Sequence, residues 1–348
     1  MKVTNNLNLT TEAQPQSSYD EGFFEAARDL LSGWAKGNMI PYQYSLPLSP
    51  DDPVRGALLW EQFAEQHKDY YQSYEAEAVI QRACDGLPQI LNRPISSYVD
   101  IGPGPVRSIE MKTARLLKTL QPTQYIPSDV SLSYLDDARL FVTENHPNID
   151  VLPTVLNIMH DVSPFETDEN SFYFLDGSTL MNIPEDEQTP NVEVGLRRNL
   201  RNVHRLMGGH GLFAFVHDTN QNEASLTRLY RHPIQDAFIM NVLYRMVRDL
   251  PINGFDPDAF SYELAWLPEQ HLVAHRAVCE KDQDVVLGDL RFNLYAGQKL
   301  QLTHSYKLPE SKVIAAATDS GFEHIASWND GNDRLVFQLF RAPPALLH

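Results

Sequence analysis

Residues 97–108 read SYVDIGPGPVRS, a short apolar strand that ends in a glycine turn. An amphipathic helix is predicted directly after the turn, over residues 107–119. Glycines at this point let the backbone approach a ligand without a Cβ in the way. The segment therefore predicts the first strand, turn and helix of a ligand-binding sheet.

The same alternation continues along the chain. Further strands are predicted at residues 123–131, 148–153, 171–178 and 211–218, with helices at about 132–145 and 191–207. Strands that alternate with helices at this spacing indicate a parallel, doubly wound α/β sheet, which binds ligands at the carboxyl ends of its strands. A helix at 311–321 and strands at 322–328 and 334–342 give the terminal helix and hairpin typical of a class I methyltransferase that uses S-adenosyl-L-methionine (SAM).

A second domain interrupts this pattern. Helices are predicted at about 222–231 and 233–248, and candidate strands follow in FSYELAWL, HLVAHRAV, DLRFNLYAG and KLQLTHSYK. We therefore expect one methyltransferase-like sheet domain together with an α+β substrate-binding domain. The expected division is a flexible tail at 1–19, the substrate domain at 20–75 and 219–305, and the methyltransferase domain at 76–218 and 306–348.

Composition excludes several classes of function. The chain has 348 residues, with 28 basic and 46 acidic side chains and a net charge of −18, which works against nucleic-acid binding. Two cysteines are too few for a disulfide scaffold or a thiolate metal cluster, and no apolar run resembles a signal peptide or a membrane span. We expect a cytoplasmic protein with a small-molecule substrate, no metal, no membrane or nucleic-acid partner, and a monomeric state rather than an oligomer.

The glycine turn contains the candidate cofactor residues Asp100, Gly102 and Gly104. A dinucleotide fingerprint would need a third glycine where Arg107 stands, which disfavours NAD. Asp129 ends the next strand, where a carboxylate can accept both ribose hydroxyls of a nucleoside. The pattern favours SAM, with an ordinary turn and a helix-capping aspartate as the structural alternatives.

The fourth predicted strand ends in a polar segment that contains Gly177 and Asn182 and can hold a zwitterion; a helix-capping loop is the alternative. This segment, YFLDGSTLMNIP (173–184), resembles the Phe-Leu-Gly-(Gly/Ser)-Thr-x-x-Asn segment of the histidine Nα-methyltransferases of ergothioneine synthesis. The likeness covers nearly the whole chain from about residue 40, in order, through LLWEQFAEQHKDYY (58–71), SLTRLYRHP (225–233), AFIMNVLYRMVRDL (237–250), FDPDAF (255–260), AW (265–266), HSYKLPES (304–311) and SWND (327–330).

The resemblance implies roles for individual residues. It implies SAM binding by the glycine turn and Asp129, substrate amino and carboxylate binding by Gly177, Asn182 and Tyr230, and a pocket lined by Tyr44, Trp60 and Tyr70. It also implies that Thr303 and Ser305 read the substrate side chain, and that a ring-packing methionine of the family aligns near Ala274 or His275. In the mechanism it implies, a methyl group passes directly from SAM to an amino acid's α-nitrogen. Asn182 orients the amine, and Tyr44 or Tyr70 takes part in proton removal.

Three departures from the family pattern bear on the substrate and on the cofactor. The histidine enzymes carry Glu where this chain has Thr303, and the ring-packing methionine is absent. The family's adenine-reading acid is also replaced by TVLNIM (154–159), which makes Asn157 the candidate substitute. Gly177 is a further candidate cofactor contact. We therefore expect a bulkier aromatic substrate, such as tryptophan or a derivative, which fungal members of the family N-methylate. Histidine itself and a SAM-binding pseudoenzyme or sensor are the alternatives.

Overall fold

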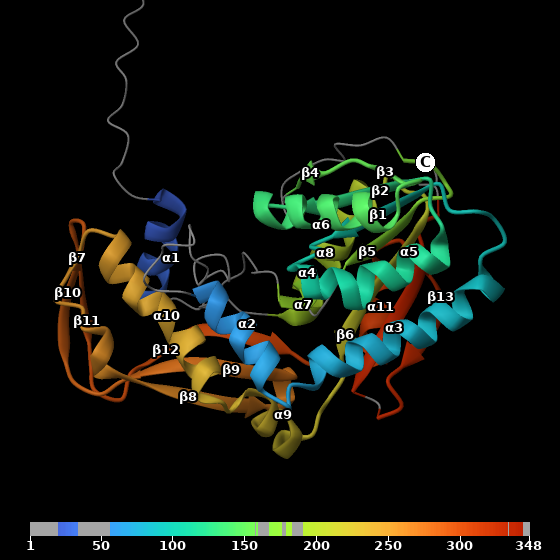
Figure 1. Ribbon diagram of the computed structural model, residues 1–348. Coiled ribbons are helices and arrows are strands. Elements are labelled where there is room, and N and C mark those ends of the chain that lie inside the picture. Colours follow the sequence, from blue (N-terminus) through green and yellow to red (C-terminus); the bar gives the residue numbers. More distant parts are fainter. Residues whose placement is uncertain are drawn as a thin grey trace, which may run out of the picture.

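The structure is a computed structural model that describes residues 20–33, 56–156, 158, 167–175, 179–182, 191–332 and 334–343. Within these residues an eight-stranded sheet has the order β13-β14-β6-β5-β1-β2-β3, with β4 also paired to β2 (Figure 1). The strands are β1 (Ser97–Ile101), β2 (Gln124–Asp129), β3 (Asp150–Val151), β4 (Thr154–Val155), β5 (Phe172–Leu175), β6 (Leu212–Asp218), β13 (Glu323–Asn329) and β14 (Leu335–Arg341).

The strand order reverses beside β1. Strand β1 pairs in parallel with β2 on one side and with β5 on the other, and β5 continues in parallel to β6. The hairpin of β13 and β14 adds antiparallel to β6. The α/β prediction is confirmed, and the crevice at a reversal point of such a sheet is its usual ligand site. It lies at the carboxyl end of β1, where the glycine turn begins.

Helices pack against the large sheet and form two apolar cores with its strands. Helices α3 (Tyr71–Ile90), α5 (Ala114–Leu120) and α6 (Leu132–Asn145) contribute to one core, whereas α8 (Val192–Leu206) and α11 (Glu310–Asp319) contribute to the other. In α8, Leu196, Leu200 and Val203 recur at helical spacing and are all buried. The helix begins at Asn191, whose side chain accepts the backbone N–H groups of residues 193 and 194.

A second group of elements lies at the left of Figure 1 and shares a third core. It contains α1 (Glu21–Leu31), α2 (Gly56–Gln66), α10 (Pro233–Asp249), β7 (Ile252–Asn253), β8 (Phe260–Leu267), β9 (Leu272–Cys279), β10 (Gln283–Leu287), β11 (Leu290–Leu294) and β12 (Lys299–Tyr306). Among the described residues these strands form two three-stranded sheets, β11-β10-β7 and β12-β9-β8. Helix α9 (Glu223–Tyr230) connects β6 to this group.

Some predicted elements differ from the structure. The predicted strand 148–153 contains only the short strand β3, and Pro153, which has no backbone N–H to donate, precedes the second short strand, β4. The predicted helix 107–119 consists of α4 (Val106–Ser108), a π-helical turn (Ile109–Thr113) and α5. Within the described ranges, no helix has the length and apolar character needed to span a membrane.

Candidate functional site

The glycine turn after β1 has the backbone conformation that its sequence predicts. Gly102 and Gly104 have φ values of +73° and +71°, a region that other residues rarely adopt. The Gly102 N–H donates to the Ser128 carbonyl of β2 at 2.8 Å. A Cβ on Gly102 would meet no heavy atom within 4 Å, so this side of the turn is open to a ligand.

Asp100 supports the turn from inside the sheet. Its carboxylate is only 1% exposed. The Oδ2 atom accepts the Thr113 hydroxyl at 2.6 Å and the Tyr125 hydroxyl at 2.9 Å. These two bonds connect β1 to the π-helical turn and to β2, which fixes the geometry of the segment that presents Gly102.

Asp129 lies at the end of β2, beside the glycine turn. Its Oδ1 accepts the Ser131 N–H at 2.9 Å, and burial raises the pKa of the carboxyl group. The neighbouring Val130 is 59% exposed, although its side chain is apolar. An exposed apolar side chain next to a carboxylate provides an apolar surface for a base and a hydrogen-bond acceptor for ribose hydroxyls. Sequence reasoning did not select Val130 as a candidate residue, although it is an apolar residue directly after a strand end.

Asn182, at the end of α7 (Thr179–Asn182), is bound to the end of β12. The Tyr306 backbone N–H donates to Asn182 Oδ1 at 2.9 Å. Because a backbone N–H can only donate, this contact fixes which end of the amide faces β12. The helix is held in turn by Asn199, whose Nδ2 donates to the Leu180 carbonyl at 2.9 Å.

A buried ion pair between Lys307 and Asp218 is hydrogen-bonded to Tyr230. Lys307 follows directly after β12, Asp218 ends β6, and neither side chain has any exposed surface. Lys307 Nζ donates to Asp218 Oδ2 at 2.9 Å and to the Tyr230 hydroxyl oxygen at 2.8 Å. The Tyr230 hydroxyl donates to Ser305 Oγ at 2.8 Å. Burial lowers the pKa of Lys307, but the Asp218 carboxylate and the Tyr230 hydroxyl together raise it by more, so its net pKa lies above the ordinary value.

The same carboxylate is bound by the start of α3. The Tyr71 hydroxyl and the Gln72 amide donate to Asp218 Oδ2 at 2.7 and 2.8 Å. The Tyr70 hydroxyl donates to Gln72 Oε1 at 2.8 Å. One hydrogen-bonded set, which we name the Asp218 network, thus joins Tyr70, Tyr71, Gln72, Asp218, Tyr230, Ser305 and Lys307. Of these, sequence reasoning selected only Tyr70, Tyr230 and Ser305 as site residues.

The register of the small sheet decides which side chain faces Thr303. Thr303 stands opposite His275 in the antiparallel pair of β12 and β9, whereas Ala274 stands opposite His304. Opposite partners share a face of a sheet, and successive residues alternate. His275 therefore shares the face of Thr303 and Ser305, and Ala274 points to the other face.

His275 is a buried side chain that contacts two tyrosines. It is 2% exposed, and its Nδ1 lies 2.6 Å from the Tyr262 hydroxyl oxygen. Its ring meets the Tyr230 ring edge to face, with centroids 5.0 Å apart. Burial lowers the pKa of His275 to about 3, so the imidazole carries no charge near neutral pH.

The remaining predicted site residues are only partly brought together. Trp60 packs against the third core, with α1 and α10, while Tyr70 packs on Phe63 with ring centroids 4.7 Å apart. Tyr44, Asn157 and Gly177 lie outside the described residues.

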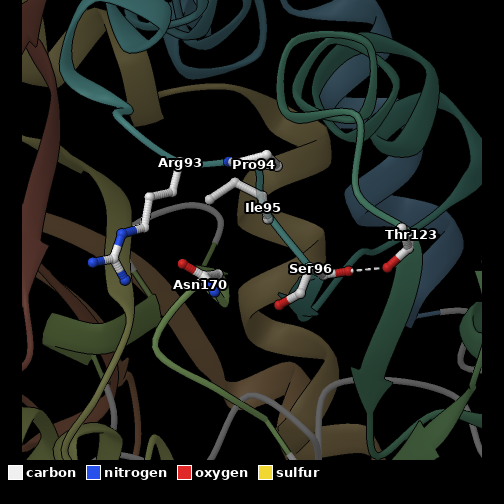
Figure 2. Close-up of a pocket in the computed structure, with 6 residues that line it drawn as sticks. All are labelled: Arg93, Pro94, Ile95, Ser96, Thr123 and Asn170. Carbon is white, nitrogen blue, oxygen red and sulfur yellow. Dashed lines mark hydrogen bonds between the residues drawn. The ribbon is translucent and has the colours of Figure 1, made fainter.

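A separate hollow occurs at the opposite end of the sheet. Figure 2 shows Arg93, Ser96, Thr123 and Asn170 around it, with the Thr123 hydroxyl donating to the Ser96 carbonyl at 2.8 Å. These residues precede β1, β2 and β5, so the hollow lies at the amino ends of the strands. It is therefore distinct from the glycine turn at the carboxyl ends.

Comparisons with known proteins agree with this geometry. A sequence profile of the "histidine-specific methyltransferase, SAM-dependent" family matches residues 51–342. The uncharacterized protein y4iF of Sinorhizobium fredii is 26% identical over 239 residues, which are 67% of this chain and 77% of that protein. The N-methyltransferase imqF of Aspergillus flavus is 25% identical over 115 residues, 32% of this chain and 31% of that protein.

Among solved structures, a SAM-dependent methyltransferase from Clostridium acetobutylicum aligns with a TM-score of 0.44 and 11% identity, over 82% of this chain and 97% of that one. The extent of the profile match settles the family. The protein is a SAM-dependent methyltransferase with the α/β fold of class I, and it belongs to the histidine-specific methyltransferase family.

Proposed function

We propose that this enzyme methylates the α-nitrogen of a free aromatic amino acid, such as tryptophan or a derivative. The observation that carries the proposal is that Asn182 and Tyr230 both bind the end of β12. Asn182 accepts the Tyr306 N–H and Tyr230 donates to Ser305, next to the carboxyl ends of the large sheet's strands. Amide and hydroxyl groups in one place suit the carboxylate and amine of a zwitterion. The weak fungal N-methyltransferase relative supports nitrogen as the acceptor.

The glycine turn and Asp129 have the features that SAM requires. We propose that Gly102 and Gly104 allow the backbone to approach the cofactor, that Asp129 accepts its ribose hydroxyls, and that Val130 contacts its adenine. Asp100 acts indirectly through its bonds to Thr113 and Tyr125. Asn157 and Gly177 remain proposed contacts. Bound SAM supplies an activated methyl group on a sulfonium, so the protein mainly has to position and desolvate the acceptor.

Positioning is the work of Asn182 and Tyr230 in this proposal. The Asn182 amide orients the amino acid's charged end, and the Tyr230 hydroxyl turns from Ser305 Oγ to donate to the substrate's carboxylate. The reacting amine must be neutral, with its lone pair directed at the methyl carbon. The Tyr70 hydroxyl already donates to Gln72, so toward the amine it acts as an acceptor, and we propose it, with Tyr44, as a participant in proton removal.

We propose that the second group of elements is the substrate domain and that the large sheet is the cofactor domain. Helix α3 starts at Tyr71 and contributes to the core of the large sheet. We therefore move the first domain boundary from residue 75 to residues 67–70. The later boundary stays at the end of β12, where Ser305 accepts from Tyr230 and the Tyr306 N–H donates to Asn182.

The charge of the pocket favours an uncharged aromatic side chain. Thr303 has no charge, and His275 is neutral because its pKa is about 3. We propose His275, rather than Ala274, as the β9 residue that meets the substrate ring, and Trp60 as a further wall of the pocket. Histidine as substrate is the second candidate, and the family's description favours it.

Restoring the family's carboxylate should change the substrate preference. We expect Thr303→Glu to raise kcat/KM for histidine relative to tryptophan by about 10-fold or more, because a carboxylate can bind an imidazole N–H with a charge-assisted hydrogen bond. The measurement is the initial rate with each amino acid. Thr303→Gln is the matched uncharged control, and an equal change in the two variants would contradict the argument.

Removing the proposed ribose ligand should weaken cofactor binding. We expect Asp129→Asn to raise the Kd of SAM by about 10- to 100-fold, since hydrogen bonds to a charged group contribute about 1.5–3 kcal/mol. Titration calorimetry with SAM measures this change. Asp136→Asn, on the exposed face of α6, is the control and should leave the Kd unaltered. A Kd for Asp129→Asn equal to that of the control would remove Asp129 from the cofactor site.

The proposed function is tested by a substrate panel. Purified protein is incubated with SAM and, separately, with tryptophan, tyrosine and histidine, and the products are weighed by mass spectrometry. A mass gain of one or more methyl groups on tryptophan supports the proposal, and a gain on histidine alone supports the second candidate. Binding of SAM without methylation of any free amino acid would contradict both.

A further inference from the structure

We propose that Lys307 is a positioning residue for the substrate's carboxylate, acting through the Tyr230 hydroxyl without touching the substrate itself. The inference rests on the proposed function, because it assumes an amino acid in this site. It assigns a role to a buried ion pair that the reaction does not otherwise use.

The first argument is the direction of the Tyr230 proton. The Lys307 ammonium has only donors, so at 2.8 Å it must occupy a lone pair of the Tyr230 oxygen. The single hydroxyl proton of Tyr230 is then directed away from Lys307, to Ser305 Oγ at 2.8 Å. Lys307 thus keeps the Tyr230 proton on the side of Ser305, where a bound carboxylate oxygen takes the place of Ser305 Oγ as its acceptor.

The second argument is the strength of that donor. A hydroxyl whose oxygen accepts from a cation is polarised and donates more strongly. Lys307 has no exposed surface, and Asp218 balances its charge at 2.9 Å. The site can therefore favour an anion through Tyr230 while the cation itself stays buried and paired.

The third argument is the position of Lys307 in the fold. The last two residues of β12 and the residue that follows them each bind a member of the proposed carboxylate site. Ser305 accepts from Tyr230, the Tyr306 N–H binds Asn182, and Lys307 donates to Tyr230. Asp218 fixes this segment to the end of β6, so the eight-stranded sheet and the β12-β9-β8 sheet of Figure 1 are joined where the proposed site lies.

The test compares an amino acid with the amine that remains when its carboxylate is removed, here tryptophan and tryptamine. The variants are Asp218→Asn/Lys307→Met, which removes both charges, and Asp218→Asn/Lys307→Gln, which keeps a neutral donor near Tyr230. We expect the first variant to lower the tryptophan-to-tryptamine ratio of kcat/KM by about 10-fold and the second to lower it less. The Kd of SAM reports that each variant is folded.

Tyr71→Phe is the control for a merely structural effect, because Tyr71 binds Asp218 at 2.7 Å but does not bind Tyr230. It should lower stability and leave the ratio intact. An unchanged ratio in folded Asp218→Asn/Lys307→Met would overturn the proposal, as would an unchanged ratio in Tyr230→Phe, which is decisive even if the charge variants do not fold. If the wild-type enzyme methylates no amino acid, that result contradicts the proposed function itself, and it is thus distinguished from a failure of the role of Lys307.

Discussion

Replacing Asn182 with Ala should reduce kcat/KM for the amino acid by about 100-fold or more, while the Kd of SAM changes by no more than about 3-fold. The reason is that Asn182 is held by Tyr306 at 2.9 Å and has the amide that orients the substrate's charged end. Loss of one preorganised polar group, or a misplacement of about 1 Å, costs a rate factor of this order. Steady-state kinetics and calorimetry measure the two quantities.

Asn199→Ala is the control for this experiment. Asn199 supports α7 by binding the Leu180 carbonyl at 2.9 Å, but it does not bind β12. We expect it to reduce stability and to affect the rate less than Asn182→Ala does. Near-normal turnover by Asn182→Ala would remove this residue from the site, whereas loss of SAM binding would show that its role is structural.

The second large effect concerns stability. We expect Lys307→Met to lower the free energy of unfolding by about 3–5 kcal/mol, because it leaves the fully buried Asp218 carboxylate without its cation. Urea unfolding, followed by far-UV circular dichroism, measures the loss. Since replacing both members of a buried pair is often close to neutral, Asp218→Asn/Lys307→Met should recover most of it.

A surface pair provides the comparison. Lys281 and Asp256 are 2.7 Å apart, but both side chains are substantially exposed. Lys281→Met should change the free energy of unfolding far less than Lys307→Met does, because exposed ion pairs contribute little to stability. If Lys307→Met is no more destabilising than Lys281→Met, the Asp218 network does not hold the eight-stranded sheet and the β12-β9-β8 sheet together.

Local sequence signals predicted the large sheet well. The strands around β1, β2, β5 and β6 have apolar runs that end in turns, and each of them is found within a few residues of its predicted range. In contrast, the strand QDVVL (283–287) was missed, although its buried residues alternate at Gln283, Val285 and Leu287.

The site was predictable only in part, because its central pair depends on distant contacts. Lys307 and Asp218 are 89 positions apart, and nothing in the sequence near either residue indicates that they meet. A buried lysine also has no local signature, since most lysines are exposed. The choice between Ala274 and His275 was ambiguous for a similar reason, and only the strand register assigns them to opposite faces.

The central claim is that the methyl group is transferred to the α-nitrogen of a free amino acid. The most direct test is to incubate the enzyme with tryptophan and SAM that has an isotopically labelled methyl group, and to locate the label by tandem mass spectrometry. We predict that the label remains with the α-amino fragment. A label on the indole nitrogen, on a ring carbon or on the carboxylate oxygen would contradict the account.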